Sequence, residues 1–169
     1  MTKTKKALLA LIFLLIFHSS CFAQKTIAQR IITIAKNEIG NGEIGKNNSG
    51  QYVKLYNKGL ESSWCAGFIS YCLKQSEYNE LDYSLSAKAI YNQAKQQNII
   101  TASAQAGDLI VFWRDSPKSW KGHIGIVERI DSNYIYTIEG NKGQFPAKVK
   151  RVRYAKNNIP KLLGYIKIK

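Results

Sequence analysis

The fold is organised around residues 62–73, which read Ser-Ser-Trp-Cys-Ala-Gly-Phe-Ile-Ser-Tyr-Cys-Leu. Apolar residues recur at positions 65, 68, 69, 72 and 73, the spacing of one buried face of an α-helix. Ser62 or Ser63 offers the side-chain oxygen that a helix N-cap requires. Cys65 then takes the second or third helical position, where free N–H groups and the helix dipole lower the pKa of a thiol. The stretch therefore predicts a helix that begins with either a reactive cysteine or the first apolar residue of a core.

The first 23 residues have the layout of a secretory signal peptide. Three lysines precede an apolar run over residues 7–17, and small residues then lead to Ala23. The run is shorter than the about 20 apolar residues that span a bilayer. We therefore expect cleavage after Ala23 and an exported mature domain over residues 24–169, with no transmembrane segment. Lipid attachment at Cys21 is the alternative.

The chain is strongly basic. Its 25 Lys and Arg against 11 Asp and Glu give a net charge of +14. Loss of the three leader lysines leaves a mature charge of about +11 by the same count. This excess favours a polyanionic partner, which can be nucleic acid, an anionic membrane or a cell-wall polymer. No nucleotide motif, linker or repeat is present, so we expect one domain, a monomer, and no specific nucleic-acid partner.

Cleavage of the leader leaves two cysteines, Cys65 and Cys72, and one histidine, His123. On one helix the two cysteines are separated by about 10.5 Å along the axis, whereas a disulfide needs Cα atoms within about 7 Å. Both thiols are therefore expected to be free, and Cys72 to be a small core residue. This residue set does not suit zinc, and we expect neither a metal nor a cofactor.

Helical periodicity comes first along the chain and strand periodicity follows from Gly107, which predicts an α+β domain with N-terminal helices packed on an antiparallel sheet. Helices are expected over residues 26–40, 51–58, 62–75 and 86–97, and strands over residues 108–114, 123–129, 134–139, 148–154 and 162–168.

Residues 123–139 are expected to form a β-hairpin. If Glu128 faces Tyr134 across the turn, His123 lies directly opposite Glu139, with Cβ atoms roughly 4.5–5.5 Å apart. Asn141 is then diagonal to His123 on the same face. A carboxylate there orients an imidazole and stabilises its protonated form. An exposed pair without chemistry is the alternative, and a register shift of one residue places Glu139 on the other face.

Four segments together resemble a CHAP domain, the cysteine, histidine-dependent amidohydrolases/peptidases related to the NlpC-type cell-wall cysteine peptidases. They are Trp-Cys-Ala-Gly-Phe at 64–68, Gly-Asp-Leu-Ile-Val-Phe at 107–112, Gly-His-Ile-Gly-Ile-Val at 122–127 and Ile-Glu-Gly-Asn at 138–141. The similarity runs from about residue 27 to the end of the chain. It implies a papain-like fold.

The resemblance also implies roles for four residues. Cys65 matches the family's nucleophile, His123 its general base, Glu139 its acidic member and Asn141 the asparagine two residues later. Whether Glu139 or Asn141 holds the imidazole is open at this point. Many CHAP domains have glutamine before the cysteine as an oxyanion donor, but this chain has Trp64, so the second donor is unassigned.

By this resemblance the protein hydrolyses an amide in peptidoglycan through an acyl-thioester on Cys65. Trp64, Trp113 and Trp120 are candidate substrate contacts, although packing and edge protection explain the tryptophans of the loop about as well. The departure at Trp64 leaves room for a catalytically weak or inactive wall-binding module on the same fold. The charge excess leaves a nucleic-acid binder or nuclease as a further alternative. The sequence does not indicate which peptidoglycan bond is cut, or whether the wall is that of the producing cell or of other cells.

Overall fold

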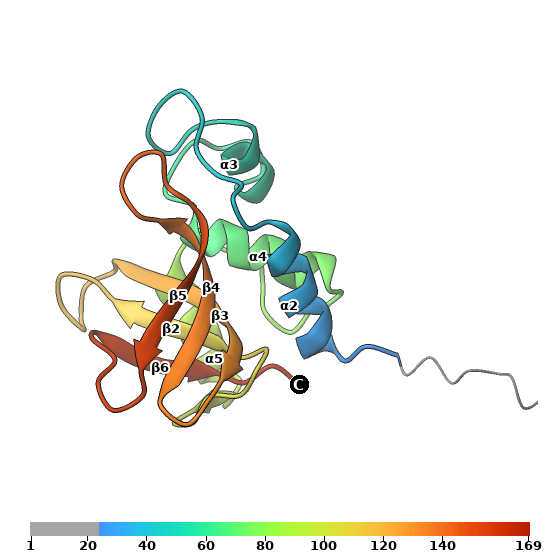
Figure 1. Ribbon diagram of the computed structural model, residues 1–169, viewed down its shortest axis with the longest axis vertical. Helices are drawn as coiled ribbons and strands as arrows, with labels where there is room; N and C mark the ends of the chain where they lie inside the picture. Colours follow the sequence, from blue (N-terminus) through green and yellow to red (C-terminus); the bar gives the residue numbers. More distant parts are fainter. Residues whose placement is uncertain (1–23) are drawn as a thin grey trace, which may run out of the picture.

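A computed structural model describes residues 24–169, so the predicted signal peptide and Cys21 lie outside the described residues. Within that range, helices precede strands, as predicted (Figure 1). The helices are α2 (Ile27–Asn37), α3 (Gln51–Tyr56), α4 (Cys65–Gln75) and α5 (Ala87–Gln96). The strands are β1 (Ile100–Thr101), β2 (Leu109–Trp113), β3 (Gly122–Ile130), β4 (Tyr134–Lys142), β5 (Lys148–Ala155) and β6 (Leu162–Ile166). The two-residue β1 is too short to carry a recognisable period, and it was not predicted.

Helix α2 begins with a capping box. The Thr26 hydroxyl accepts a hydrogen bond from the backbone N–H of Gln29, and the Gln29 side chain accepts one from the Thr26 N–H. These two bonds satisfy N–H groups that a helix end otherwise leaves free. Ile31 and Ala35 on the inner face of this helix are fully buried, so the helix is fixed both by its cap and by its apolar side.

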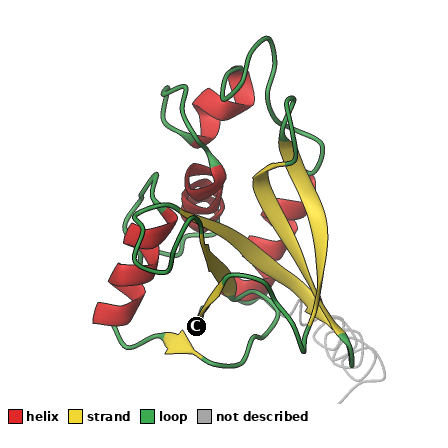
Figure 2. Cartoon of the chain, turned by 90° about the vertical axis from the view of Figure 1, so that its left-hand side faces the viewer, coloured by secondary structure: helices red, strands yellow, loops and turns green. Residues whose placement is uncertain are grey.

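The six strands form one antiparallel sheet in the order β1-β6-β2-β3-β4-β5. Figure 2 shows this sheet strongly twisted, with its long strands curving past the helices. Helix α4 packs on β3 and β4, α2 on β3, and α5 on β2 and β3. The centre of the sheet thus supports the start of α4, where Cys65 lies.

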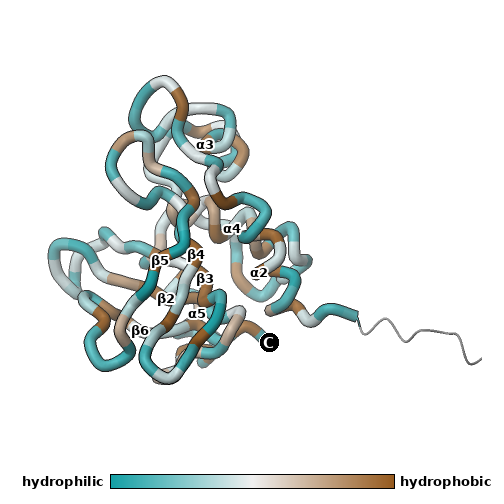
Figure 3. Tube along the Cα trace, in the orientation of Figure 1, coloured by the Kyte–Doolittle hydropathy of each residue, from teal (hydrophilic) through white to brown (hydrophobic). Residues whose placement is uncertain are grey.

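Alternate residues of β2 belong to two apolar clusters, as expected for a strand that is buried on both faces. Leu109 and Val111 face the larger cluster, which the helices share. Ile110 and Phe112 face a smaller one, which the curled sheet closes with Tyr165 and other residues. Figure 3 shows hydrophobic segments where α4 meets the strands and mostly hydrophilic loops at the periphery. No helix of the described part of the chain is long and apolar enough to cross a membrane.

The register of the β3–β4 hairpin differs from the predicted one. Ile126 pairs with Ile138, and a bulge at Glu128 interrupts the ladder. The predicted pairing of Glu128 with Tyr134 is out of register by three residues at the turn, where Ile130 pairs with Ile135. The bulge shifts the ladder back by one residue, so the prediction misplaced β4 by two residues along β3 at Ile126. Because side chains alternate with a period of two, an error of two residues keeps Glu139 on the face of His123. Glu139 therefore lies diagonal to His123 rather than directly opposite.

Helix α4 and strand β4 touch at Gly140. A Cβ atom at this position would lie 2.7 Å from the Cβ of Phe68, closer than packed carbon atoms approach. Replacement of Gly140 by alanine is therefore expected to lower the free energy of unfolding by about 1–3 kcal/mol, measured by denaturant unfolding. Combination with Phe68→Ala, which removes the Cγ and Cδ1 atoms that would lie 2.9 Å from the added Cβ, should destabilise the protein less than the sum of the two single changes. Strict additivity of the two changes, or an unchanged Gly140→Ala stability, would contradict this packing.

Candidate active site

Helix α4 begins at Cys65, and Trp64 is its N-cap residue without a capping side chain. The predicted serine cap was wrong. The side-chain amide of Asn57 instead donates to the carbonyl oxygen and the hydroxyl of Ser62. These bonds hold the segment before the helix, so a side-chain cap is not needed to define where the helix starts. Cys65 is the first helical residue, it is 6% exposed, and its thiol lines a cavity of about 280 Å³.

His123 on β3 and Glu139 on β4 form a buried pair. The Nε2 atom of His123 lies 2.8 Å from an Oε atom of Glu139, and both side chains are almost completely buried. The carboxylate reaches diagonally across Gly125, where a Cβ atom would lie 2.6 Å from the Cγ of Glu139. Glycine at 125 is therefore required for this contact. The bond at Nε2 leaves Nδ1 as the ring nitrogen that can serve the Cys65 thiol.

Three further groups bind the carboxylate of Glu139. The hydroxyls of Thr137 and Tyr154 donate to one oxygen at 2.7 and 2.8 Å, and the ammonium of Lys142 lies 2.8 Å from the other. Burial of a carboxylate without such partners is strongly unfavourable, whereas hydrogen bonds to the charged form keep it ionised. Glu139 is thus held as a fixed anion behind the imidazole.

The pKa values in this cluster move in a consistent direction. Burial alone would raise the pKa of Cys65 and of Glu139 and lower that of His123, but the interactions among these groups outweigh it. The hydrogen bond and charge of His123, with the charge of Arg114, lower the pKa of Cys65. Bonds to Cys65 and Glu139 raise the pKa of His123. His123 and Lys142 lower the pKa of Glu139 to about 2. Together these shifts favour a thiolate–imidazolium pair in front of a carboxylate.

The same shifts predict a pH dependence. The ion pair forms as pH rises through the lowered pKa of Cys65 and is lost as pH rises through the raised pKa of His123. Alkylation of Cys65 by iodoacetamide should therefore remain fast at pH 6–7, below the ordinary thiol pKa of about 8.5. In His123→Ala the rate at pH 6–7 should fall by about tenfold or more. Rates read by mass spectrometry of the Cys65 peptide check this, and an ordinary thiol titration in the wild type would exclude the ion pair.

Asn141 does not hold the imidazole. Its side-chain amide donates to the hydroxyl of Ser63 and to the side chain of Asn48, both at 3.2 Å, and among the described residues it forms no hydrogen bond to His123. Asn141 has a positive φ of 53°, which turns its side chain toward the segment before α4. Glu139 is accordingly the residue that the geometry assigns to orienting His123, and Asn141 braces the Cys65 loop.

The three candidate tryptophans lie in different environments. Trp64 was wrongly proposed as a substrate contact, because it is completely buried. It stacks on Tyr56 and donates from Nε1 to Glu43 at 3.3 Å. Trp120 is 77% exposed and lines the cavity beside Cys65, and Trp113 lines a second cavity beside His123. Only these two can border a substrate.

Cys65 and Cys72 are free thiols, as predicted. Cys72 lies in the core, where burial raises the pKa of its thiol well above the usual value. Within residues 24–169, no cluster of three or more His, Cys, Asp or Glu side chains could hold a metal ion.

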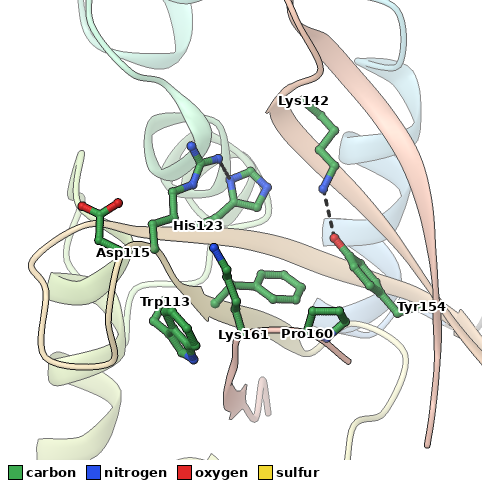
Figure 4. A pocket seen from close by; sticks show the side chains of 9 residues that line it. Trp113, Asp115, His123, Lys142, Tyr154, Pro160 and Lys161 are labelled. Atoms are coloured by element: carbon green, nitrogen blue, oxygen red, sulfur yellow. Dashed lines mark hydrogen bonds between the residues drawn. The ribbon is translucent and has the colours of Figure 1, made fainter. Parts of the chain in front are cut away.

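Sequence reasoning missed Arg114. One of its guanidinium nitrogens lies 3.2 Å from Nδ1 of His123, and its side chain lines the cavities on both sides of the Cys65–His123 pair. The cavity on the His123 side has a volume of about 380 Å³ (Figure 4). A signal for Arg114 was available, since it directly follows the strand whose Phe112 pairs with His123. Its side chain could not be assigned to the site without the antiparallel pairing of β2 and β3.

A helix that starts at a buried cysteine, packed on an antiparallel sheet that carries a His–Glu pair, defines an α+β domain of the papain-like class. A model of the CHAP domain matches residues 56–141, just over half of the chain. This range includes Cys65, His123 and Glu139. The chain belongs to the CHAP domain family.

Comparison with solved structures agrees with this fold. The crystal structure of Ly7917 superimposes with a TM-score of 0.52 at 17% identity, over 84% of this chain and 62% of Ly7917. Ly7917 with the hydrolyzing product of MDP gives the same score and identity, over 82% and 62%. An NLP/P60-family protein similar to lipoprotein, from Staphylococcus aureus subsp. aureus Mu50, has a TM-score of 0.47 and 17% identity, over 89% and 44%. The chain thus spans about three fifths of Ly7917. No curated protein sequence matches it.

Proposed function

We propose that this protein is an exported cysteine-dependent hydrolase that cleaves an amide bond of peptidoglycan, as an amidase or an endopeptidase. The observation that carries the proposal is the arrangement of Cys65, His123 and Glu139, in which a buried carboxylate bonds Nε2 and leaves Nδ1 to the thiol. Membership of the CHAP domain family supports the choice of an amide substrate. A structural relative, the complex of Ly7917 with the hydrolyzing product of MDP, is in keeping with a cell-wall substrate.

In the proposed reaction the Cys65 thiolate attacks the amide carbonyl while the proton of the thiol resides on Nδ1 of His123. The imidazolium passes that proton to the leaving amine, and the C–N bond breaks to give an acyl-thioester. Water, deprotonated by the neutral imidazole, then attacks the thioester and releases the acid and the free thiol. Glu139 stabilises the imidazolium at each stage and keeps the ring in place.

The surroundings of Cys65 suit an extended peptide. Cavities flank the Cys65–His123 pair on both sides, and Trp120 and Trp113 border one each. The mature net charge of about +11 suits an anionic cell wall. The N-terminal residues read as a signal peptide, which takes the enzyme to the compartment of that substrate. We infer that it acts outside the cytoplasm as a monomer without a cofactor.

The test is digestion of purified peptidoglycans of several chemistries, followed by mass spectrometry of the released fragments. New amine and carboxyl termini are expected, and their masses name the bond that is cut. The control is the same protein after iodoacetamide treatment, with modification of Cys65 verified by peptide mapping. Intact wall in every digest, together with tight sedimentation of the protein on the wall, would instead favour an inactive wall-binding module.

A further inference from the structure

The cavity beside His123 is strongly cationic. Three positive side chains, Arg114, Lys142 and Lys161, line it with only one carboxylate, that of Asp115. In Figure 4 the amino groups of Lys142 and Lys161 both point into the space next to His123. The rest of the wall is largely aromatic. Such a space, apolar with a few convergent charges of one sign, is suited to a small anionic group.

Two of these cations have no carboxylate partner. Lys142 is paired with Glu139 at 2.8 Å, and Asp115 is paired with Lys121 at 2.9 Å. Among residues 24–169, neither Arg114 nor Lys161 forms an ion pair, and the Lys161 ammonium lies 5.2 Å from the centre of the Trp113 ring. An exposed guanidinium and ammonium that share one cavity can bind a carboxylate with charge-assisted hydrogen bonds.

The hydrogen bond from Arg114 to His123 competes with Cys65. A guanidinium only donates, so the 3.2 Å contact places the lone pair of Nδ1 toward Arg114 and the ring proton on Nε2, toward Glu139. The same Nδ1 lone pair must take the thiol proton for the ion pair to form. Arg114 at Nδ1 and a proton at Nδ1 therefore exclude each other, so molecules of the free protein are divided between the Arg114-bound imidazole and the thiolate–imidazolium pair.

We propose that Arg114, together with Lys161, binds a carboxylate of the substrate peptide, and that this contact draws Arg114 away from Nδ1 of His123. The proposal rests on the proposed function and assigns a substrate feature to the same site. The freed Nδ1 takes the proton of the Cys65 thiol, so a neutral thiol and imidazole become thiolate and imidazolium with no other group gained or lost. A carboxylate next to the scissile amide then both positions the substrate and completes the nucleophile.

The first test alkylates Cys65 in the full-length chain with iodoacetate and, separately, with iodoacetamide, and reads the Cys65 peptide by mass spectrometry. Iodoacetate carries a carboxylate where iodoacetamide carries a neutral amide. We expect the iodoacetate-to-iodoacetamide rate ratio at Cys65 to exceed that of N-acetylcysteine by about tenfold, and Arg114→Gln to lower it by about tenfold, the effect of one charged hydrogen bond. Lys118→Gln, which removes a charge from the same loop but lines neither cavity, should keep the wild-type ratio. Equal ratios in wild type and Arg114→Gln overturn the proposal.

The second test uses two matched muropeptides, one with free stem carboxylates and one with the same groups as carboxamides. Wild type should have a kcat/KM about tenfold higher for the carboxylate form. Arg114→Gln should lose this preference, so that the ratio of the two kcat/KM values falls to about one. A uniform loss of rate on both substrates would show a merely structural role and overturn the proposal. If neither muropeptide is hydrolysed but the alkylation ratio still depends on Arg114, the proposed function is contradicted and the anion site is supported.

Discussion

Replacement of Cys65 by alanine is expected to lower kcat for amide hydrolysis by at least about 10⁴-fold, because alanine cannot form the acyl-thioester. The effect is this large because a nucleophile and its base act as a unit, so removal of one member leaves the other without a role. Hydrolysis of purified muropeptides under single-turnover conditions measures it. The folded structure should remain, since Cys65 lies at the start of α4 and its side chain borders a cavity.

Cys72→Ala is the matched control for that experiment. Cys72 lies seven positions further along α4, is completely buried and belongs to the core. Its loss should reduce the free energy of unfolding modestly and leave kcat within about twofold, because its thiol is far from His123 on the helix. Equal activity of Cys65→Ala and wild type would show that this chain is not a cysteine hydrolase. Loss of activity in Cys72→Ala with unchanged stability would show that Cys72, and not Cys65, is the reactive thiol.

The second large effect is expected for Glu139→Gln. The change keeps the shape of the side chain but removes the charge that raises the pKa of His123. The pKa of His123 should therefore fall and that of Cys65 rise, which narrows the pH range of the ion pair from both sides. We expect kcat/KM to fall by about 10³–10⁴-fold, as when an amide replaces the acid of a catalytic triad. It should also destabilise the fold by about 1–3 kcal/mol, since the buried side chain loses its charged hydrogen bonds to His123 and Lys142.

A pH profile of kcat/KM together with the rate of Cys65 alkylation separates these effects. Glu128→Gln is the control, because Glu128 is another buried carboxylate on the same hairpin. It accepts hydrogen bonds from two guanidinium nitrogens of Arg151 at 2.9–3.1 Å and forms an ion pair with Lys36, and it forms no hydrogen bond to His123. Glu128→Gln should lower stability but leave the pH profile unchanged. An unchanged pH profile in Glu139→Gln would contradict the assignment of Glu139 as the residue that raises the pKa of His123.

Local sequence was sufficient for the class of fold. Helical and strand periods depend on which positions are apolar, and burial of those positions is what stabilises the elements, so α2 to α5 and the main strands could be predicted. The separation of Cys65 and Cys72 by two helical turns excluded a disulfide for the same local reason. The start of α4 was not predicted correctly, because no side chain caps it and the amide of Asn57 instead holds the preceding segment through Ser62.

The residues that perform the proposed chemistry could be nominated from the sequence by their resemblance to a family, but their contacts could not. The bulge at Glu128 changes the hairpin register, and Glu139 reaches His123 only because Gly125 leaves space for it. The positive φ of Asn141 carries its side chain to Ser63 instead of the imidazole. Arg114 enters the site through the pairing of β2 with β3, far from Cys65 in sequence.

The stretch 62–73 by itself therefore determined a helix with a cysteine in its first turn, because helix periodicity and terminal N–H groups are local properties. Whether that cysteine is a core residue or a nucleophile depends on which groups lie against its sulfur. Those groups come from β3 and from the end of β2, and non-local strand pairing decides their positions. Only the tertiary structure places His123, Glu139 and Arg114 around Cys65 and buries Trp64 beneath it.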